Sequence, residues 1–478
     1  MVNYICSKIV GARYYVLGDD SARDFEGHGS HTASIAAGNN VKNASFYGLA
    51  HGTARGGVPS ARIAVYKVCS IVGCREEDIL AGFDDAIADG VDIISVSLGG
   101  LFFVELEYDT IAIASFHATQ KGVLTVHSAG NEDKNLVQGK ILLCNNTFND
   151  DIIEDVKRVG ARGLIYLSDD YVSDVVPYAT STLNSQQFHL VESYINSTKL
   201  AQANILTSEA IRSSNAPTVA TFSSRGPNPI FPDILKPDIS APGVEILAAY
   251  SAAASPSYYP NLDGRSVGYN ILSGTSMSCP HVTGAAAYVK SLHPNWSPSA
   301  IKSALMTTAW QMNASDAEFS YGAGHLNPSK AAHPGLVYET FKADYIKMIC
   351  GLNISSSALK KIFTDNSTCT KVVPIYTKDL NYPTITSQVP KQKLFRISFS
   401  RTVTNVGLSN STYKATIHKT TTQLKVSVKP NILSFKALNE RKSFVVTVNG
   451  GRIRGMISTS LEWFDGIHVV RSPIVIYT

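Results

Sequence analysis

The sequence predicts an α/β protein with a doubly wound parallel sheet, followed by a β-sandwich. From residue 62 to residue 126, strand-like apolar runs alternate with runs whose apolar residues recur at helical spacing. This alternation is typical of βαβ units, which place their strands in one parallel sheet. After residue 378 apolar and polar residues alternate one by one, as at Leu424, Val426 and Val428. A period of two predicts half-buried strands, and many such strands predict a sandwich.

The individual elements follow from local signals. A helix over 76–89 is indicated by Ile79, Leu80 and Phe83 at helical spacing, and Gly90 ends it. Ser297 caps a helix over 297–308, with Pro298 in its first turn. The same reasoning predicts further helices over 109–120 and 151–159, and strands over 63–68, 91–96, 123–126 and 163–167.

Composition excludes several partners. The net charge of +4, from 42 Lys and Arg against 38 Asp and Glu, is too small and too scattered to favour nucleic acid or a membrane surface. No apolar run reaches the roughly 18 residues of a membrane-spanning helix. The His residues lack metal-ligand spacing, so we expect no metal and no cofactor. The sequence does not determine the oligomeric state.

The strongest candidate for chemistry is the stretch 274–281, GTSMSCPH, which precedes the Ala-rich apolar run 282–292. A Ser beside a Gly turn at the start of a helix is exposed, and the unpaired backbone N–H groups of that helix end surround it. An acyl-transfer nucleophile needs this environment, because the N–H groups stabilise an oxyanion. The alternative interpretation of Ser276 is an ordinary N-cap.

Two further stretches supply the partners that such a nucleophile needs. His28 lies in GHGSHTA, 27–33, at another predicted turn-to-helix junction, and Asn131 ends SAGN, 128–131, after an apolar strand. A general base, a nucleophile and an oxyanion donor together predict acyl transfer. With these motifs the chain resembles the subtilisin-like serine proteases, and within them the plant cucumisin-like branch, along nearly its whole length.

The resemblance implies roles for individual residues. It makes His28 the charge-relay base, Ser276 the nucleophile and Asn131 the oxyanion donor, acting on a peptide or protein substrate. It also implies that the strand end at Ser97, Leu98 and Gly99 binds the substrate backbone as an added strand.

The chain departs from the family at two places. The family's triad Asp lies on a strand a few dozen residues before the His, but only residues 1–27 precede His28. After Asn131, residues 132–135 lead directly into a segment that resembles the interior of the family's protease-associated domain. We therefore expect an incomplete first part of the catalytic domain at 1–134, a protease-associated remnant at 135–208, the second catalytic part at 209–345, a connector at 346–377 and a fibronectin type III-like domain at 378–478.

Cysteines and glycosylation motifs bear on the compartment. Among seven Cys, the pairs Cys69 with Cys74 and Cys350 with Cys369 resemble disulfides of the family, and Cys279 is expected to be a packed thiol. Cys6 and Cys144 are left without partners. Eight Asn-x-Ser/Thr motifs suit a secreted glycoprotein, so the resemblance implies an extracellular protein although residues 1–13 lack the pattern of a signal peptide.

Other signals are weaker. GRSVG at 264–268 fits the Gly-x-Ser-x-Gly elbow but lacks its strand-to-helix context. His31 and His281 are expected to be packed helical residues, and Asp24 is one of three nearby acids that could orient His28.

The predicted function is a serine endopeptidase. The alternative is a catalytically impaired relative, without the charge-relay Asp, that acts as a peptide-binding or interaction protein.

Overall fold

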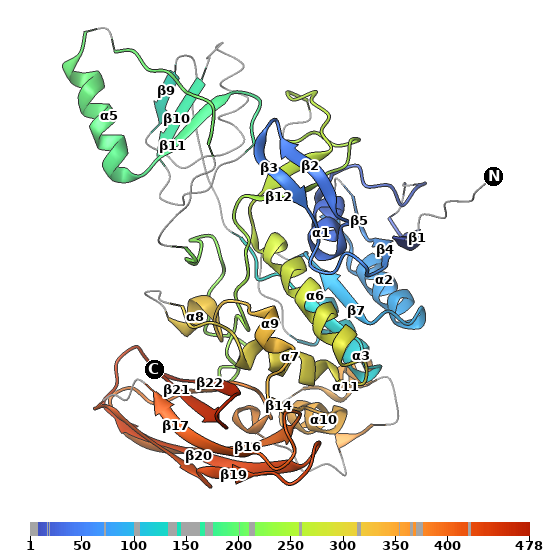
Figure 1. Ribbon diagram of the computed structural model, residues 1–478, viewed down its shortest axis with the longest axis vertical. Helices are drawn as coiled ribbons and strands as arrows, with labels where there is room; N and C mark the ends of the chain where they lie inside the picture. The colour runs from blue at the N-terminus through green and yellow to red at the C-terminus, as the bar shows by residue number, and fades with distance from the viewer. Residues whose placement is uncertain are drawn as a thin grey trace.

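The computed structural model describes most of the chain in three regions (Figure 1). An α/β part occupies the centre, a small sheet with helix α5 lies at the upper left, and a β-sandwich forms the base. The described residues are 8–16, 18, 20–70, 73–99, 106–131, 141–144, 163–167, 175–199, 201–209, 216–257, 261–312, 317–352, 354–363, 367–369, 376–418 and 422–478.

Parallel strand pairs and the helices around them form the α/β part. Strand β1 (Ile9–Tyr14) pairs in parallel with β4 (Ile63–Lys67), and β7 (Ile93–Val96) pairs in parallel with β8 (Leu124–His127). The strands predicted over 63–68, 91–96 and 123–126 are confirmed. In the described part of the chain, however, these strands form two separate pairs, and no ladder joins β4 to β7. The alternation pattern identifies strands, but adjacency in space decides which of them share hydrogen bonds.

The predicted helices are confirmed with small shifts of their ends. Residues 76–89 form α2 (Glu76–Ala88), and residues 109–120 form α3 (Thr110–Gln120), where the Asp109 side chain accepts a hydrogen bond from the Ala112 N–H as N-cap. Ser297 caps α7 (Pro298–Thr307) in the same way, with Pro298 in the first turn.

Helix α6 (Thr275–Leu292) is the central helix, and small residues let it approach its neighbours closely. A Cβ added to Gly284 would lie 3.1 Å from the Ala36 carbonyl oxygen and 3.1 Å from the Gly57 Cα. The absence of a side chain there brings α6 against α1 (His28–Ala37), which begins at His28. On its other side α6 packs Ala285, Ala286 and Val289 against Leu124 of β8 and Ile301 of α7.

Shorter elements complete the α/β part and its connector. Disulfides Cys69–Cys74 and Cys350–Cys369 are both formed, as expected, and Cys279 is a buried free thiol. The remaining elements are β2 (Val41–Phe46), β3 (Leu49–Ala54), β5 (Cys69–Ser70), β6 (Gly73–Cys74), β12 (Ile246–Ala249), β13 (Tyr269–Leu272), α8 (Glu318–Tyr321), α9 (Pro328–Ala331), α10 (Lys342–Cys350), α11 (Ser356–Ile362) and the 3₁₀ helix η2 (Thr377–Asp379).

The small sheet contains three parallel strands, β9 (Ile141–Cys144), β10 (Gly163–Leu167) and β11 (Ala179–Leu183), with β10 in the middle. The strand predicted over 163–167 is thus confirmed. Helix α5 (Ser185–Ser197) follows, capped reciprocally by Asn184 and Gln187. The helix predicted over 151–159 lies outside the described residues.

The predicted sandwich has two sheets around a core that includes Trp463, Phe399 and Phe444. One sheet has the order β14-β16-β20-β18 and the other β15-β22-β21-β17-β19. Their strands are β14 (Leu336–Tyr338), β15 (Ile385–Gln388), β16 (Leu394–Asn405), β17 (Thr412–His418), β18 (Leu424–Lys429), β19 (Ile432–Ser434), β20 (Arg441–Gly451), β21 (Met456–Phe464) and β22 (Val469–Tyr477).

Strand β22 joins the sandwich to the α/β part because both of its faces are buried. Ile474 and Ile476 belong to the sandwich core, while Val475 and Tyr477 pack against Leu235 and Phe319 of the α/β part. Across the described residues, no helix combines the length and apolar character that crossing a membrane requires.

Candidate functional site

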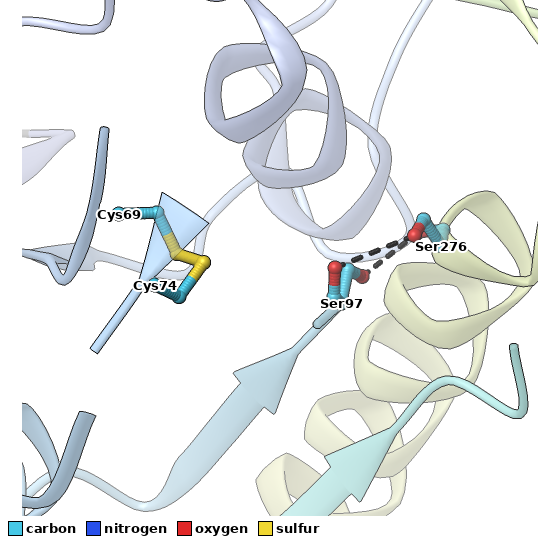
Figure 2. Close-up of a disulfide and its surroundings, with 4 residues drawn as sticks. All are labelled: Cys69, Cys74, Ser97 and Ser276. Atoms are coloured by element: carbon cyan, nitrogen blue, oxygen red, sulfur yellow. Dashed lines mark hydrogen bonds between the residues drawn. A yellow bond between two sulfur atoms is a disulfide. The ribbon is translucent and has the colours of Figure 1, made fainter. Parts of the chain in front are cut away.

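Ser276 lies in the first turn of α6, and its hydroxyl faces the end of β7. The Ser276 hydroxyl donates to the Ser97 carbonyl oxygen at 3.3 Å, and the Ser97 hydroxyl donates to the Ser276 carbonyl oxygen at 2.8 Å. Figure 2 shows this reciprocal pair between the strand end and the helix start. Two bonds in opposite directions fix the backbone of Ser276 relative to β7.

Asn131 approaches the same helix end from β8. Its Oδ1 accepts hydrogen bonds from the Thr275 N–H at 3.2 Å and from the Thr275 hydroxyl at 3.4 Å. Thr275 Oγ1 in turn accepts from the Gly130 N–H at 3.0 Å. The loop after β8 is therefore tied to the residue immediately before Ser276.

The surroundings of Gly274 show how close the Asn131 side-chain amide lies to the Ser276 backbone nitrogen. A Cβ at this position would lie 3.3 Å from the Asn131 Nδ2 and 3.8 Å from the Ser276 backbone nitrogen. A side chain would crowd the Asn131 amide, which explains why a glycine precedes Thr275. The Asn131 Nδ2 and the Ser276 backbone nitrogen, the two donors expected for an oxyanion, thus lie within 4 Å of one point, with the Asn131 Oδ1 at 3.8 Å from it.

The other residues of the predicted strand edge differ in their surroundings. The Leu98 carbonyl oxygen accepts from the Ser128 hydroxyl at 3.2 Å, and the Leu98 side chain packs against the cluster of Ile79, Phe83 and Val96. Gly99 is exposed, and a Cβ there would meet nothing within 4 Å. The edge is thus anchored at Ser97 and Leu98 and open at Gly99.

His28 is the first residue of α1, and Asp24 organises this helix end. The Asp24 carboxylate accepts from the Gly27 N–H at 2.8 Å and from the Ser30 N–H at 2.7 Å. Burial lowers the pKa of His28 from its ordinary 6.5, and the negative charge of Asp24 partly opposes this shift. A lowered pKa keeps the imidazole neutral near pH 7, which is the form that can accept a proton.

Hydrogen bonds do not join all the predicted residues. They connect Ser276 to Ser97 and Asn131 to Thr275, whereas the described residues include no bond from the His28 ring to Ser276 or to a carboxylate. His28 is brought to this region by the packing of α1 on α6. Asp24, one of the acids considered for orienting His28, instead caps α1 with its carboxylate oxygens.

Sequence reasoning missed Thr275 and Tyr250. The Tyr250 hydroxyl donates to the Glu26 carbonyl oxygen at 2.8 Å, and its ring occupies the space where a side chain on Gly27 would be. Thr275 could have been found, because it lies between the turn glycine and the candidate nucleophile. Tyr250 lies in no motif, so no signal in the sequence pointed to it.

The remaining candidates have packing roles, as expected. His31 is fully buried, with Nε2 at 3.0 Å from the Ile246 carbonyl oxygen, and the His281 Nδ1 is 2.8 Å from the Met277 carbonyl oxygen. Cys279 Sγ contacts the Val126 carbonyl oxygen at 3.3 Å, and burial raises the pKa of this thiol. Ser266 lies outside any helix or strand and donates to the Ala252 carbonyl oxygen. Within the described ranges no cluster of His, Cys, Asp and Glu could hold a metal ion.

Comparison with known proteins identifies the family of the chain. Residues 6–324 match the subtilase family, and residues 379–476 match a fibronectin type-III domain. Subtilisin-like protease SBT4.6 of Arabidopsis thaliana is 45% identical over 570 residues, covering 99% of this chain and 76% of that protein. SBT4.9 and SBT4.10 of the same plant are 48% and 49% identical, covering 100% of this chain and 75% and 73% of theirs.

These alignments are longer than the chain itself. They extend over 570, 541 and 515 residues, whereas this chain has 478. The relatives therefore contain residues, inside the aligned region, that this chain lacks. The matches cover most of the α/β part and nearly all of the sandwich, and we conclude that this chain belongs to the subtilase family of serine proteases and ends in a fibronectin type III domain.

Proposed function

We propose that the chain is a serine endopeptidase in which Ser276 attacks the scissile carbonyl of a peptide or protein. His28 takes the proton from the Ser276 hydroxyl and returns it to the leaving amine. The Asn131 amide and the Ser276 N–H stabilise the oxyanion of the tetrahedral intermediate. The substrate backbone adds as a strand along Ser97, Leu98 and Gly99.

The observation that carries this proposal is the convergence of Asn131 and Ser276 on one helix end. The two nitrogens lie 3.3 Å and 3.8 Å from the same point beside Gly274. Two donor nitrogens near one point, next to a hydroxyl, suit an acyl-transfer intermediate better than they suit an ordinary helix cap. The lowered pKa of His28 supports its role as the base.

A fluorophosphonate probe tests the nucleophile, because only an activated hydroxyl reacts readily with it. We expect labelling at Ser276 and none in Ser276→Ala. Ser266→Ala is the matched control, since Ser266 lies in the competing GRSVG stretch, and it should label like the native protein. Labelling that persists in Ser276→Ala would refute the assignment.

A second candidate function is peptide binding without turnover. It is favoured by the hydrogen bonds of Asp24, whose carboxylate is engaged by the backbone of α1, and by the absence of any bond between His28 and a carboxylate among the described residues. In subtilisin, loss of the triad Asp costs about 3 × 10⁴ in turnover. Peptide binding at native affinity by Ser276→Ala, together with an unlabelled native protein, would favour this function.

The chain organisation and the compartment are also proposals. We assign 135–208 to a remnant of a protease-associated domain, supported by the parallel sheet of β9, β10 and β11 with α5. We assign the protein to the extracellular space, supported by its two disulfides, which persist in oxidising compartments. Peptide mapping that found all eight glycosylation motifs of the expressed protein unmodified would argue against secretion.

A further inference from the structure

The small net charge of the chain hides a strong asymmetry between its parts. Residues 379–476 contain 14 Lys and Arg against four Asp and Glu, while the rest of the chain contains 28 against 34. The sandwich is therefore strongly basic and the remainder is acidic. Surface charges act over roughly 10 Å at moderate salt, so a partner near the sandwich experiences a positive potential.

Strand register gathers this charge on one surface, which we call the basic face. Phe395, Ile397 and Phe399 of β16 point into the core, so the alternate residues of that strand point outward. The pairing of β16, β20 and β18 then places outward residues in rows across three strands. The first row is Arg396, Asn449 and Lys425, the second is Ser398, Thr447 and Ser427, and the third is Ser400, Val445 and Lys429.

The cations of the basic face are exposed and spaced along it. At the usual strand geometry, Arg396 and Lys425 are roughly 10 Å apart across the sheet, and Lys425 and Lys429 are roughly 13 Å apart along β18. Lys393 and Arg452 extend the face beyond the first row, because the Arg452 N–H donates to the Lys393 carbonyl oxygen at 3.4 Å. All five side chains are exposed.

In the part of the chain that the structure describes, no carboxylate pairs with the cations of the basic face. Asp379, which accepts from the Ser400 N–H at 3.4 Å, is itself paired with Lys378 at 2.6 Å. Between residues 380 and 461 the sequence has a single acidic residue, Glu440, and its carboxylate pairs with Lys442 at 2.9 Å. Among the described residues, Arg396, Lys425 and Lys429 form no ion pair. Folding therefore leaves these cations available to an external anion.

The basic face is also open. The sandwich contacts the α/β part through Val475 and Tyr477 of β22 in the other sheet, and through Val337 of β14, which pairs with β16 only at residues 403–405, beyond the rows of the basic face. In Figure 1 the sandwich forms the base of the molecule, below the α/β part. A long partner can thus lie across β16, β20 and β18.

From this surface we infer that the sandwich binds an acidic polysaccharide, a linear chain of sugars bearing carboxylates. The spaced cations fit charges repeated along a chain, and the row of Ser398, Thr447 and Ser427 offers hydroxyl groups to sugar hydroxyls. The outward positions include no aromatic residue on which bases could stack, which disfavours single-stranded nucleic acid. Only Leu394 and Val445 among them are large and apolar, too few to insert into a lipid surface.

The test measures binding of the full chain to polygalacturonate, with three substitutions on the basic face, Arg396→Gln, Lys425→Gln and Lys429→Gln. A matched control removes the same charge elsewhere, at the exposed residues Lys42, Arg62 and Lys121. We expect the native protein to bind in a salt-dependent manner, the face variant to bind at least about tenfold more weakly, and the control to bind within about twofold of native. Thermal melting should show that both variants remain folded.

Three further outcomes decide the chemistry of the partner. Fully methyl-esterified polygalacturonate, which has no charge, should not bind, and equal binding would refute the role of the carboxylates. Equal loss of affinity in both variants would show that only net charge matters, and would overturn the assigned face. Equally tight binding of RNA, or of vesicles containing phosphatidylserine, at the same salt would overturn the assignment to a polysaccharide.

Discussion

At the scale of single residues, Ser97 has a second role beside the one proposed for its backbone. Its hydroxyl holds the Ser276 carbonyl at 2.8 Å, while its carbonyl accepts the Ser276 hydroxyl at 3.3 Å. In this arrangement the nucleophile is held by β7 and is not bonded to His28. A substrate N–H that bonded the Ser97 carbonyl would compete with the Ser276 hydroxyl and release it toward the base.

Substitution of Ser97 tests this positioning role. Ser97→Ala removes the bond to the Ser276 carbonyl, so the first turn of α6 is less firmly placed. We expect fluorophosphonate labelling to slow by about tenfold, which corresponds to roughly 1.4 kcal/mol of barrier. Ser97→Thr, which keeps the hydroxyl, should recover most of the rate. Ser128→Ala, whose hydroxyl contacts Leu98 and not Ser276, is the control, and a loss as large as that of Ser97→Ala would contradict the role.

His31 makes folding sensitive to pH. Its Nε2 lies between the Ile246 and Asn270 carbonyl oxygens, and its Nδ1 has no hydrogen-bond partner among the described residues. Burial lowers the pKa of His31 from 6.5 to about 4, because the buried site disfavours the charged imidazolium, and the bonds to the two carbonyl oxygens only partly oppose this shift. The unfolded chain binds this proton near pH 6.5 and the folded protein does not, so stability is lost as the pH falls.

The expected loss for His31 is about 3 kcal/mol of unfolding free energy between pH 6.5 and about 4. His31→Gln keeps a side-chain N–H donor and cannot take up the proton. Urea unfolding at pH 7.5 and at pH 4.5 should show a smaller difference for His31→Gln than for the native protein. An equal pH dependence in both would mean that His31 is not the titrating group.

At the scale of elements, the N-terminus of α1 is stabilised by Asp24, a residue that lies before its first turn. Burial disfavours the charge of Asp24, but hydrogen bonds from Ser30, Gly27 and Glu26 outweigh it, so the pKa of this carboxyl lies below its ordinary value. The Gly27 residue at the start of the helix has no side chain to act as a cap. Asp24 supplies the missing acceptor from three residues further back.

We expect Asp24→Ala to lower the unfolding free energy by about 1 kcal/mol, the usual cost of losing a helix cap. It should also lower the pKa of His28, because the negative charge of Asp24 raises that pKa. Chemical denaturation measures the first effect and NMR titration of the imidazole the second. Asp20→Ala, at an exposed position, should change neither, and an unchanged His28 titration in Asp24→Ala would contradict the electrostatic coupling.

At the scale of the whole molecule, the sandwich and the α/β part share a hydrophobic contact. Phe319 and Tyr477 meet edge to face, with ring centroids 5.1 Å apart, and Arg471 donates to the Ala323 carbonyl oxygen at 2.9 Å. Burial of both faces of β22 couples the two parts energetically. We therefore expect them to unfold in one transition.

Phe319→Ala tests this coupling. Loss of a buried aromatic side chain costs about 3 kcal/mol. We expect a lower melting temperature and two resolved calorimetric transitions in place of one. Phe464→Ala removes a ring that is 44% exposed on β21, and it should leave a single transition near that of the native protein. A single transition in Phe319→Ala would show that other contacts couple the parts.

Local sequence signals were enough to locate most of the elements and to propose the candidate site residues. Helical spacing and a stop at Gly90 located α2, and Ser297 with Pro298 located the start of α7, because these signals act within a few residues. Cys69 and Cys74 could be paired by resemblance. Ser276, His28 and Asn131 were recognised because each lies in a short motif beside a helix start or a strand end.

How these residues meet depends on contacts between segments that are far apart in the chain. The bonds of Ser97 with Ser276 join positions 179 residues apart, and the contact of Asn131 with Thr275 joins positions 144 apart. The division of the parallel strands into two pairs, and the role of Tyr250 beside Gly27, also depend on packing between distant segments. The rows of the basic face follow from strand register, which the spacing of charges along the sequence does not specify.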